Sequence, residues 1–236
     1  MYSIIETPIL GIILTILAFD LGLKLSKRIN ISLFHPLLIA VCLIIIVLTV
    51  CQIPLANYQI GGSVITYFLS PLTVVLALPL YRQLHHIKKN FFPIIGGITI
   101  GLLTGAFLTT LLGSLFNISN ELLISIVPKS ITTPIALSLT DMLGGIDAIT
   151  TIFVVISGVL GAIISPIVYR YYQLDNSVAK GVGIGASSHA VGTSKAMEMG
   201  ETEGATSSAS IGLTGLIAIL IIPAFLELLS YLGLLA

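Results

Sequence analysis

Long apolar stretches alternate with short polar connections along the chain. A helical crossing of a bilayer needs roughly 20 mainly apolar residues, and most of these stretches approach or exceed that length. The pattern therefore predicts an all-α fold, a polytopic transmembrane helix bundle. The expected segments are 7–24, 34–52, 61–81, 92–116, 122–142, 147–169, 178–197 and 204–234.

Composition supports the same class of protein. Apolar residues make up 56% of the 236 residues and charged residues only 8%, whereas a soluble domain carries about 25% charged residues. We therefore expect lipid to cover most of the surface. No room remains for a separate soluble domain, so 1–236 is interpreted as a single integral membrane domain. The formal net charge is zero, which gives no reason to expect nucleic acid as a partner.

Basic residues orient the bundle, because they are retained on the cytoplasmic side of a membrane. They gather in the loops 24–33 and 82–91, whereas the loops 53–60 and 117–121 contain none. This alternation predicts an external N-terminus, with the two basic loops in the cytoplasm.

Arg170 and Lys180 mark another cytoplasmic loop, which creates a problem of parity. Segments 122–142 and 147–169 separate this loop from an external one, and two full crossings would leave it outside. One segment must therefore fail to cross. Segment 122–142 contains two prolines and a lysine, and we expect it to enter from outside, turn, and leave on the same side.

Segment 178–197 is also unsuited to lipid as a plain helix, because it contains four glycines, four hydroxyl residues and a histidine. Irregular backbone at membrane depth is tolerated where protein or water satisfies its polar groups. We expect a re-entrant or broken segment that enters from the cytoplasm. Two discontinuous segments entering from opposite faces resemble the layout of many secondary transporters. A faint echo between 79–82 and 166–170 leaves an inverted repeat open.

Rows of small residues spaced by four favour close helix contact. We interpret two such rows as packing faces, although Ser208 could also serve a binding site. The rows are Gly97, Gly101 and Gly105, and Gly204, Ser208 and Gly212.

Lys129 belongs to a first polar cluster, with Ser130, Thr132 and Thr133. A lysine near the bilayer centre costs roughly 2.5–3.5 kcal/mol on insertion scales, so it needs a partner or water. Its charge would attract an anion, and the hydroxyls could form directional hydrogen bonds. Alternatively, Lys129 lies at the outer interface and extends its ammonium toward the headgroups. The residues alone leave both interpretations open.

A second polar cluster comprises Ser187, Ser188, His189, Gly192 and Thr193. Histidine titrates near physiological pH and can relay protons or recognise a carboxylate. The alternative is a core histidine bonded to a carbonyl, but the surrounding hydroxyls and glycines favour a functional residue.

The last segment opens with Glu203, followed by Ser207 and Ser208, and we add these three to the candidate binding residues. A carboxylate suits a helix N-terminus, so capping is the simpler interpretation of Glu203.

Enzyme signatures are missing from the sequence, which has no Walker loop, no His-Glu-x-x-His and no Gly-x-Ser-x-Gly. Cys42 and Cys51 lie in or beside one apolar segment, where small packing residues are expected rather than a disulfide or a metal pair. We therefore expect a protein that is not an enzyme, with no catalytic residue, no cofactor and no metal.

Three motifs resemble signatures of the LrgB/CidB family. They are Pro-Lys-Ser-Ile-Thr-Thr-Pro at 128–134, Ser-His-Ala-Val-Gly-Thr at 188–193 and Glu-Gly-Ala-Thr-Ser-Ser at 203–208. Their order, their spacing and the surrounding hydropathy agree over nearly the whole chain. Apart from Ser187, the candidate residues named above fall within these motifs.

The resemblance implies a multi-pass protein of the bacterial cytoplasmic membrane, encoded beside a small holin-like partner of the LrgA/CidA type. Family members are described as antiholin-like or holin-like modulators of murein hydrolase activity, autolysis and programmed cell death. A relative in the chloroplast envelope transports glycolate and glycerate, and some bacterial systems of this type are linked to pyruvate movement.

Two hypotheses follow. The first is a carrier for small monocarboxylates, in which Lys129 supplies positive charge, hydroxyls bind the substrate oxygens and His189 couples protonation to movement. The second is a regulatory partner that controls a holin-like protein and has no carrier activity of its own. Small-residue faces make a homo-oligomer the expected state in either case.

Overall fold

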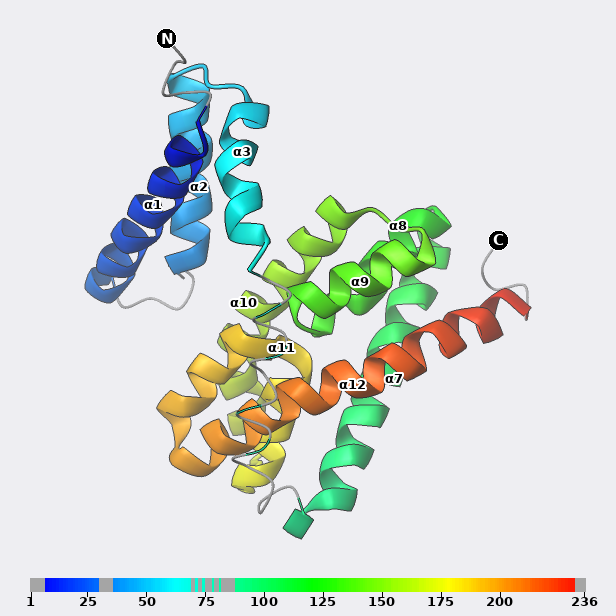
Figure 1. Ribbon diagram of the computed structural model, residues 1–236. Helices are drawn as coiled ribbons and strands as arrows, with labels where there is room; N and C mark the ends of the chain where they lie inside the picture. The colour runs from blue at the N-terminus through cyan, green and yellow to red at the C-terminus, as the bar shows by residue number, and fades with distance from the viewer. Residues whose placement is uncertain are drawn as a thin grey trace. The chain divides into compact units, whose positions relative to one another are not determined.

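The computed structural model consists of helices (Figure 1). Internal contacts divide the chain into two compact units, Met1–Leu72 and Thr73–Ala236, and each is described by itself. The expectation of one membrane domain over 1–236 stays a prediction. The structure describes residues 7–29, 36–68, 71, 74, 78, 81 and 88–231.

The N-terminal unit contains α1 (Pro8–Ile29), α2 (Pro36–Val50) and α3 (Leu55–Thr66). Polar Asn57 and Gln59 hide the start of α3 in the hydropathy pattern, so the predicted start at 61 is too late. Pro54 precedes the first helical residue, and proline is tolerated at a helix start because its missing N–H would have no partner there. The remainder of the predicted segment 61–81 falls largely outside the described residues.

Two glycines let α1 and α3 approach closely. A Cβ added to Gly61 would lie 2.7 Å from the Cα of Gly11, and one added to Gly11 would lie 2.9 Å from the Cα of Gly61. The hydroxyls of Thr15 and Tyr58, 2.9 Å apart, join the same two helices. Close backbone approach and interhelical hydrogen bonds are the usual sources of helix association in lipid.

The second unit contains three long helices, α7 (Phe91–Leu115), α10 (Asp147–Tyr171) and α12 (Glu201–Tyr231). Together with α1, these are the four helices, among the described residues, that are long and apolar enough to cross a membrane. The prediction of an all-α membrane helix bundle is confirmed.

A buried stripe on α7 forms one wall of the core of this unit. Its residues recur every four positions, as expected for one helix face, and they join apolar side chains from α10 and α12 in a single cluster. The cluster includes Ile94, Ile98, Leu102, Ala106, Val154, Ala218 and Ile222.

Segment 122–142 forms a helical hairpin, here named hairpin 1. It comprises α8 (Asn120–Ile126), a 3₁₀ turn η2 (Val127–Ser130) and α9 (Thr133–Leu143). Ser125 of the first arm accepts a hydrogen bond at its Oγ from the N–H of Ile146 (2.7 Å), just beyond the second arm. The hydroxyl of Thr150 donates to the carbonyl oxygen of Ser125 (2.9 Å) and lies 2.7 Å from the hydroxyl of Thr140. These bonds hold the end of the first arm against the end of the second arm and the start of α10. The backbone is extended at Ile131 and Thr132, so the predicted interruption of segment 122–142 is confirmed, whereas its exit on the side from which it entered stays a prediction.

A second hairpin, hairpin 2, is formed by α11 (Ser177–Met199). Its backbone leaves the helical conformation at His189, where φ is 41° and ψ is −136°. Gly185 before this point and Thr193 after it both contact Ser207 of α12, and Gly192 packs back onto Ile184. The chain therefore reverses at His189, as predicted for a broken or re-entrant segment.

The bases of the two hairpins lie at opposite ends of α10. Ile146 and Thr150, at its N-terminal end, bind hairpin 1. Tyr169, at its C-terminal end, donates its hydroxyl to the carbonyl oxygen of Lys180 at the base of hairpin 2 (2.9 Å). The sides of the membrane from which the two hairpins enter stay a prediction.

The helix α7 runs antiparallel to α10. Gly97 near its start faces Val182 of hairpin 2, and Gly113 near its end contacts Leu123 of hairpin 1. Each of these long helices is followed in sequence by a hairpin, and the two helix–hairpin units run in opposite directions. Inverted repeats have units opposed in this way, and a repeat in this chain stays a prediction.

Four helices end on one residue in a left-handed conformation, namely Gln52, Asn117, Gly144 and Gln173. In each case the following N–H donates to the carbonyl oxygen five residues back, which satisfies a carbonyl that the helix leaves open. These caps explain why α7, α9 and α10 end with tight turns into the next element.

We expect Gly61→Ala to destabilise the N-terminal unit by about 1–3 kcal/mol, the range for overpacking a filled contact. Its Cβ would collide with backbone of α1. Gly62→Ala is the matched control, because its Cβ would meet only the Tyr58 ring at 3.8 Å. The measurement is the melting temperature of each variant in detergent. Equal melting temperatures would contradict the close contact.

Candidate functional site

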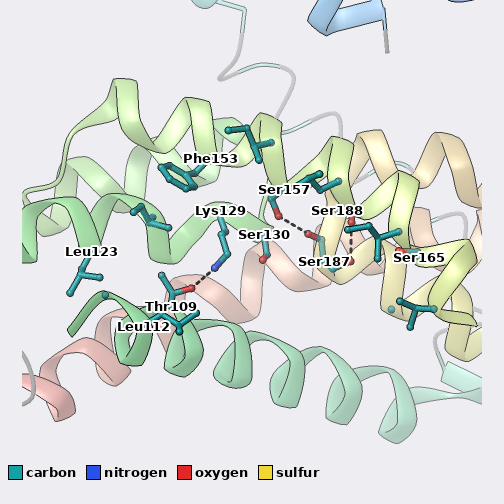
Figure 2. Close-up of a pocket in the computed structure, with 18 of the residues that line it drawn as sticks. Thr109, Leu112, Leu123, Lys129, Ser130, Phe153, Ser157, Ser165, Ser187 and Ser188 are labelled. Carbon is teal, nitrogen blue, oxygen red and sulfur yellow. Dashed lines mark hydrogen bonds between the residues drawn. The ribbon is translucent and has the colours of Figure 1, made fainter. Parts of the chain in front are cut away.

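A cavity of about 730 Å³ lies where the tips of the two hairpins meet α7 and α10. It is named the central cavity here, and Figure 2 shows the side chains that line it. Apolar side chains form most of its wall. Its charged and hydroxyl-bearing residues include Lys129, Ser130, Ser157, Ser165, Ser187 and Ser188.

Lys129 reaches the cavity from the 3₁₀ turn at the tip of hairpin 1 (Figure 2). Its ammonium donates a hydrogen bond to the hydroxyl of Thr109 on α7. The ion pairs of the described residues are Lys24–Asp20 and Lys195–Glu198, so no carboxylate in that part of the chain pairs with Lys129. Lys129 is half-buried and lines the cavity, and Thr109 is the neutral partner of its ammonium within the described part of the chain.

Hairpin 2 contributes Ser187 and Ser188, whose hydroxyl oxygens are 2.9 Å apart. The hydroxyl of Ser157 on α10 donates to the carbonyl oxygen of Ser187 (3.2 Å). Ser188 packs directly against Gly161 of α10. A side chain in place of this glycine would collide with the hydroxyl of Ser188. Sequence-predicted residues from both polar clusters, Lys129 and Ser130 with Ser187 and Ser188, thus line one cavity.

His189 lies behind the cavity wall. Its ring is 6% exposed, and Nε2–H donates to the carbonyl oxygen of Val154 at 2.9 Å. This fixes the tautomer, because a carbonyl can only accept. The sequence left open a functional histidine or a core histidine bonded to a carbonyl, and the structure has the ring bonded to a carbonyl. The ring fits because Gly158 has no side chain, since a Cβ there would lie 2.6 Å from Cε1 of His189.

The residues after His189 join hairpin 2 to α12. The hydroxyl of Thr193 donates to the carbonyl oxygen of His189 (2.9 Å) and lies 2.7 Å from the hydroxyl of Ser207. Both side chains are buried, as is Gly192. They hold the tip of hairpin 2 in place and do not line the central cavity.

The remaining candidates lie away from the cavity wall. Thr132 is buried in the extended link before α9, and its hydroxyl has no hydrogen-bond partner in the described part of the chain. Thr133 is the first residue of α9. Glu203 lies in the first turn of α12 beside Gly200, where the helix dipole favours a carboxylate, and Ser208 is half-buried farther along α12.

The glycine row of α7 differs from the packing face that we expected. Gly97, Gly101 and Gly105 line a second cavity of about 510 Å³, and a Cβ at Gly101 or Gly105 would meet nothing within 4 Å. Missing side chains at these positions open space rather than bring helices together. Gly204 in the other row does pack closely, against Met197.

Sequence reasoning missed the contributions of α7 and α10 to the site. Thr109 binds Lys129, and Ser157 binds hairpin 2, but single hydroxyl residues are common in apolar spans and gave no signal. A usable signal existed in α10, where Ser157, Gly158, Gly161 and Ser165 interrupt an apolar run. Small residues so spaced mark a helix face that another backbone approaches.

Comparison with known proteins gives the family. A model described as the LrgB-like family matches residues 15–228 of the chain. The protein belongs to the LrgB-like family. Protein YxaC of Bacillus subtilis (strain 168), described as uncharacterized, is 40% identical over 205 residues, which cover 87% of this chain and 89% of YxaC.

A second relative carries a functional name. Antiholin-like protein LrgB of Bacillus cereus (strain B4264) is 30% identical over 225 residues, which cover 95% of this chain and 98% of the relative. No solved structure matches this LrgB-like chain. The match over nearly full length in both directions confirms the resemblance that the three motifs indicate.

We expect Gly158→Ala to displace the His189 ring and to destabilise the protein, again by about 1–3 kcal/mol. Gly96→Ala is the control, because a Cβ at Gly96 would meet nothing within 4 Å. Melting temperatures in detergent provide the comparison. The clash also predicts coupling, so that Gly158→Ala should cost less in a His189→Ala background, where the opposing ring is absent. Additive effects of the two substitutions would show that the ring lies elsewhere.

Proposed function

We propose that this LrgB-like protein carries small monocarboxylates, such as pyruvate or glycolate, across the bacterial cytoplasmic membrane. The observation that carries the proposal is the ammonium of Lys129 on the wall of the central cavity. A charge at membrane depth is costly unless it has a partner or water. A bound anion would supply the opposite charge that the described residues around Lys129 do not.

The hydroxyls of the cavity favour a carboxylate with a further oxygen. Ser130 and Ser187 each offer one donor and two acceptor positions, and the contact of Ser187 with the fully buried Ser188 leaves part of that capacity unused. A carboxylate bound at Lys129 would place a neighbouring hydroxyl or keto oxygen toward these serines. A single lysine matches one carboxylate better than two.

The hairpin tips provide a path for movement. Ser130, Gly183 and Ser187 line both the central cavity and the second cavity, so they form the partition between the two. In the proposed cycle the substrate passes this partition when the tips separate. The glycine row of α7 keeps the second cavity open on the far side.

A second function is favoured by the name of a relative. The Bacillus cereus protein at 30% identity is called antiholin-like, which supports a regulatory partner of a small holin-like membrane protein that affects murein hydrolase activity and autolysis. The test is copurification of this protein with such a partner, together with murein hydrolase activity in cells lacking it. The two functions are compatible, since solute flux could itself alter autolysis.

We expect Lys129→Gln to reduce monocarboxylate flux into proteoliposomes by at least about tenfold, because losing even 1.4 kcal/mol of binding corresponds to a factor of ten. Lys24→Gln is the matched control, as Lys24 is exposed and pairs with Asp20 in the other unit. Membrane insertion and elution volume of both variants should equal those of the unaltered protein. Unchanged flux in Lys129→Gln would refute the assigned role of this lysine.

A further inference from the structure

The central cavity is larger and more apolar than a three-carbon acid requires. Pyruvate has six non-hydrogen atoms and displaces only a few water molecules, each of which takes roughly 30 Å³ in the liquid. The cavity measures about 730 Å³, within the range of about 300–1,000 Å³ typical of pockets for larger organic ligands. Pyruvate alone would leave most of this volume unfilled.

The serines of the cavity lie together on one side of Lys129. In Figure 2 they extend from Ser130 toward Ser188, while Leu112, Leu123 and Phe153 lie on the other side of the ammonium. Apolar residues of α10, Leu160 and Ile164, also line the cavity beside Gly161 and Ser165. Ile126, one turn from Leu123, also lines the cavity. An ordered water needs two to four polar partners, and this apolar end offers none from its side chains. It is therefore better filled by hydrocarbon than by water.

We infer that the preferred substrates are 2-oxo or 2-hydroxy monocarboxylates that carry a branched aliphatic or aromatic side chain. The inference rests on the proposed transport function and narrows its substrate class. The carboxylate binds Lys129, the 2-oxygen faces Ser130 and Ser187, and the side chain fills the apolar end formed by Leu112, Leu123, Ile126 and Phe153. Each added methylene that is buried contributes about 0.8 kcal/mol, which corresponds to nearly fourfold in affinity.

The experiment measures binding and flux on the same purified, full-length protein. Radiolabelled 4-methyl-2-oxopentanoate is displaced in detergent by pyruvate, 2-oxobutanoate, 3-methyl-2-oxobutanoate, 4-methyl-2-oxopentanoate and phenylpyruvate, and uptake of the same acids into proteoliposomes is followed in parallel. We expect the half-displacing concentration to fall by about three- to fourfold per added carbon until the cavity is filled. The uncharged amide of 4-methyl-2-oxopentanoate should displace the label at least tenfold more weakly.

Two substitutions on neighbouring positions of α10 locate the side-chain site. Phe153→Ser makes the apolar end polar and should flatten the dependence on chain length. Ile152→Ser is the matched control, since Ile152 is 51% exposed and does not line the cavity. It should leave the dependence on chain length as in the unaltered protein. An undiminished dependence in Phe153→Ser would overturn the assignment of the side chain to this end.

The outcomes separate this inference from the proposed function. Flux of pyruvate with equal or weaker binding of the larger acids would overturn the inference and leave transport standing. Graded binding without flux of any acid would support the ligand class and refute transport. Equal displacement by the amide would overturn the pairing of carboxylate and Lys129. Absence of binding and of flux for every acid would refute both.

Discussion

Backbone that leaves a helix at membrane depth must have its polar groups satisfied, because lipid offers no hydrogen bonds. The second unit meets this requirement twice, once at each hairpin. Ser125 and Thr150 join the arms of hairpin 1 to the start of α10, and His189 joins the tip of hairpin 2 to the carbonyl oxygen of Val154. These interruptions bring hydroxyls and an ammonium to the wall of the central cavity.

The same bonds fix the geometry of the cavity. The conformation of His189, with a positive φ, is one that non-glycine residues adopt at a cost of about 1–3 kcal/mol. The hydrogen bonds of its ring and of its carbonyl oxygen with Val154 and Thr193 offset that cost. The tip is thereby held against Gly158 and Gly161, so Ser187 and Ser188 are positioned before any ligand arrives.

The broad fold could be predicted from the sequence because hydropathy and charge act over whole segments. Counting crossings between basic loops predicted that segment 122–142 or segment 147–169 fails to cross, and the prolines and the lysine of 122–142 indicated which one is interrupted. The glycine row at Gly97, Gly101 and Gly105 shows the limit, since the same spacing suits helix contact and open space, and only the position of the neighbouring hairpin decides. Lys129 and His189 were both candidates by residue type, but their roles depend on the groups around them. Lys129 binds the hydroxyl of Thr109 at the cavity wall, whereas His189 binds the carbonyl oxygen of Val154 behind that wall.

The helix α10 serves both hairpins, and this has a consequence for how the sequence can change. Its anchor for hairpin 1, Thr150, precedes its anchor for hairpin 2, Val154, by just over one turn. One inserted residue between them would rotate the second anchor by about 100° and advance it by about 1.5 Å. The spacing of these two positions therefore sets the register of hairpin 1 against hairpin 2. Insertions and deletions are expected in the connecting loops and not in this part of α10.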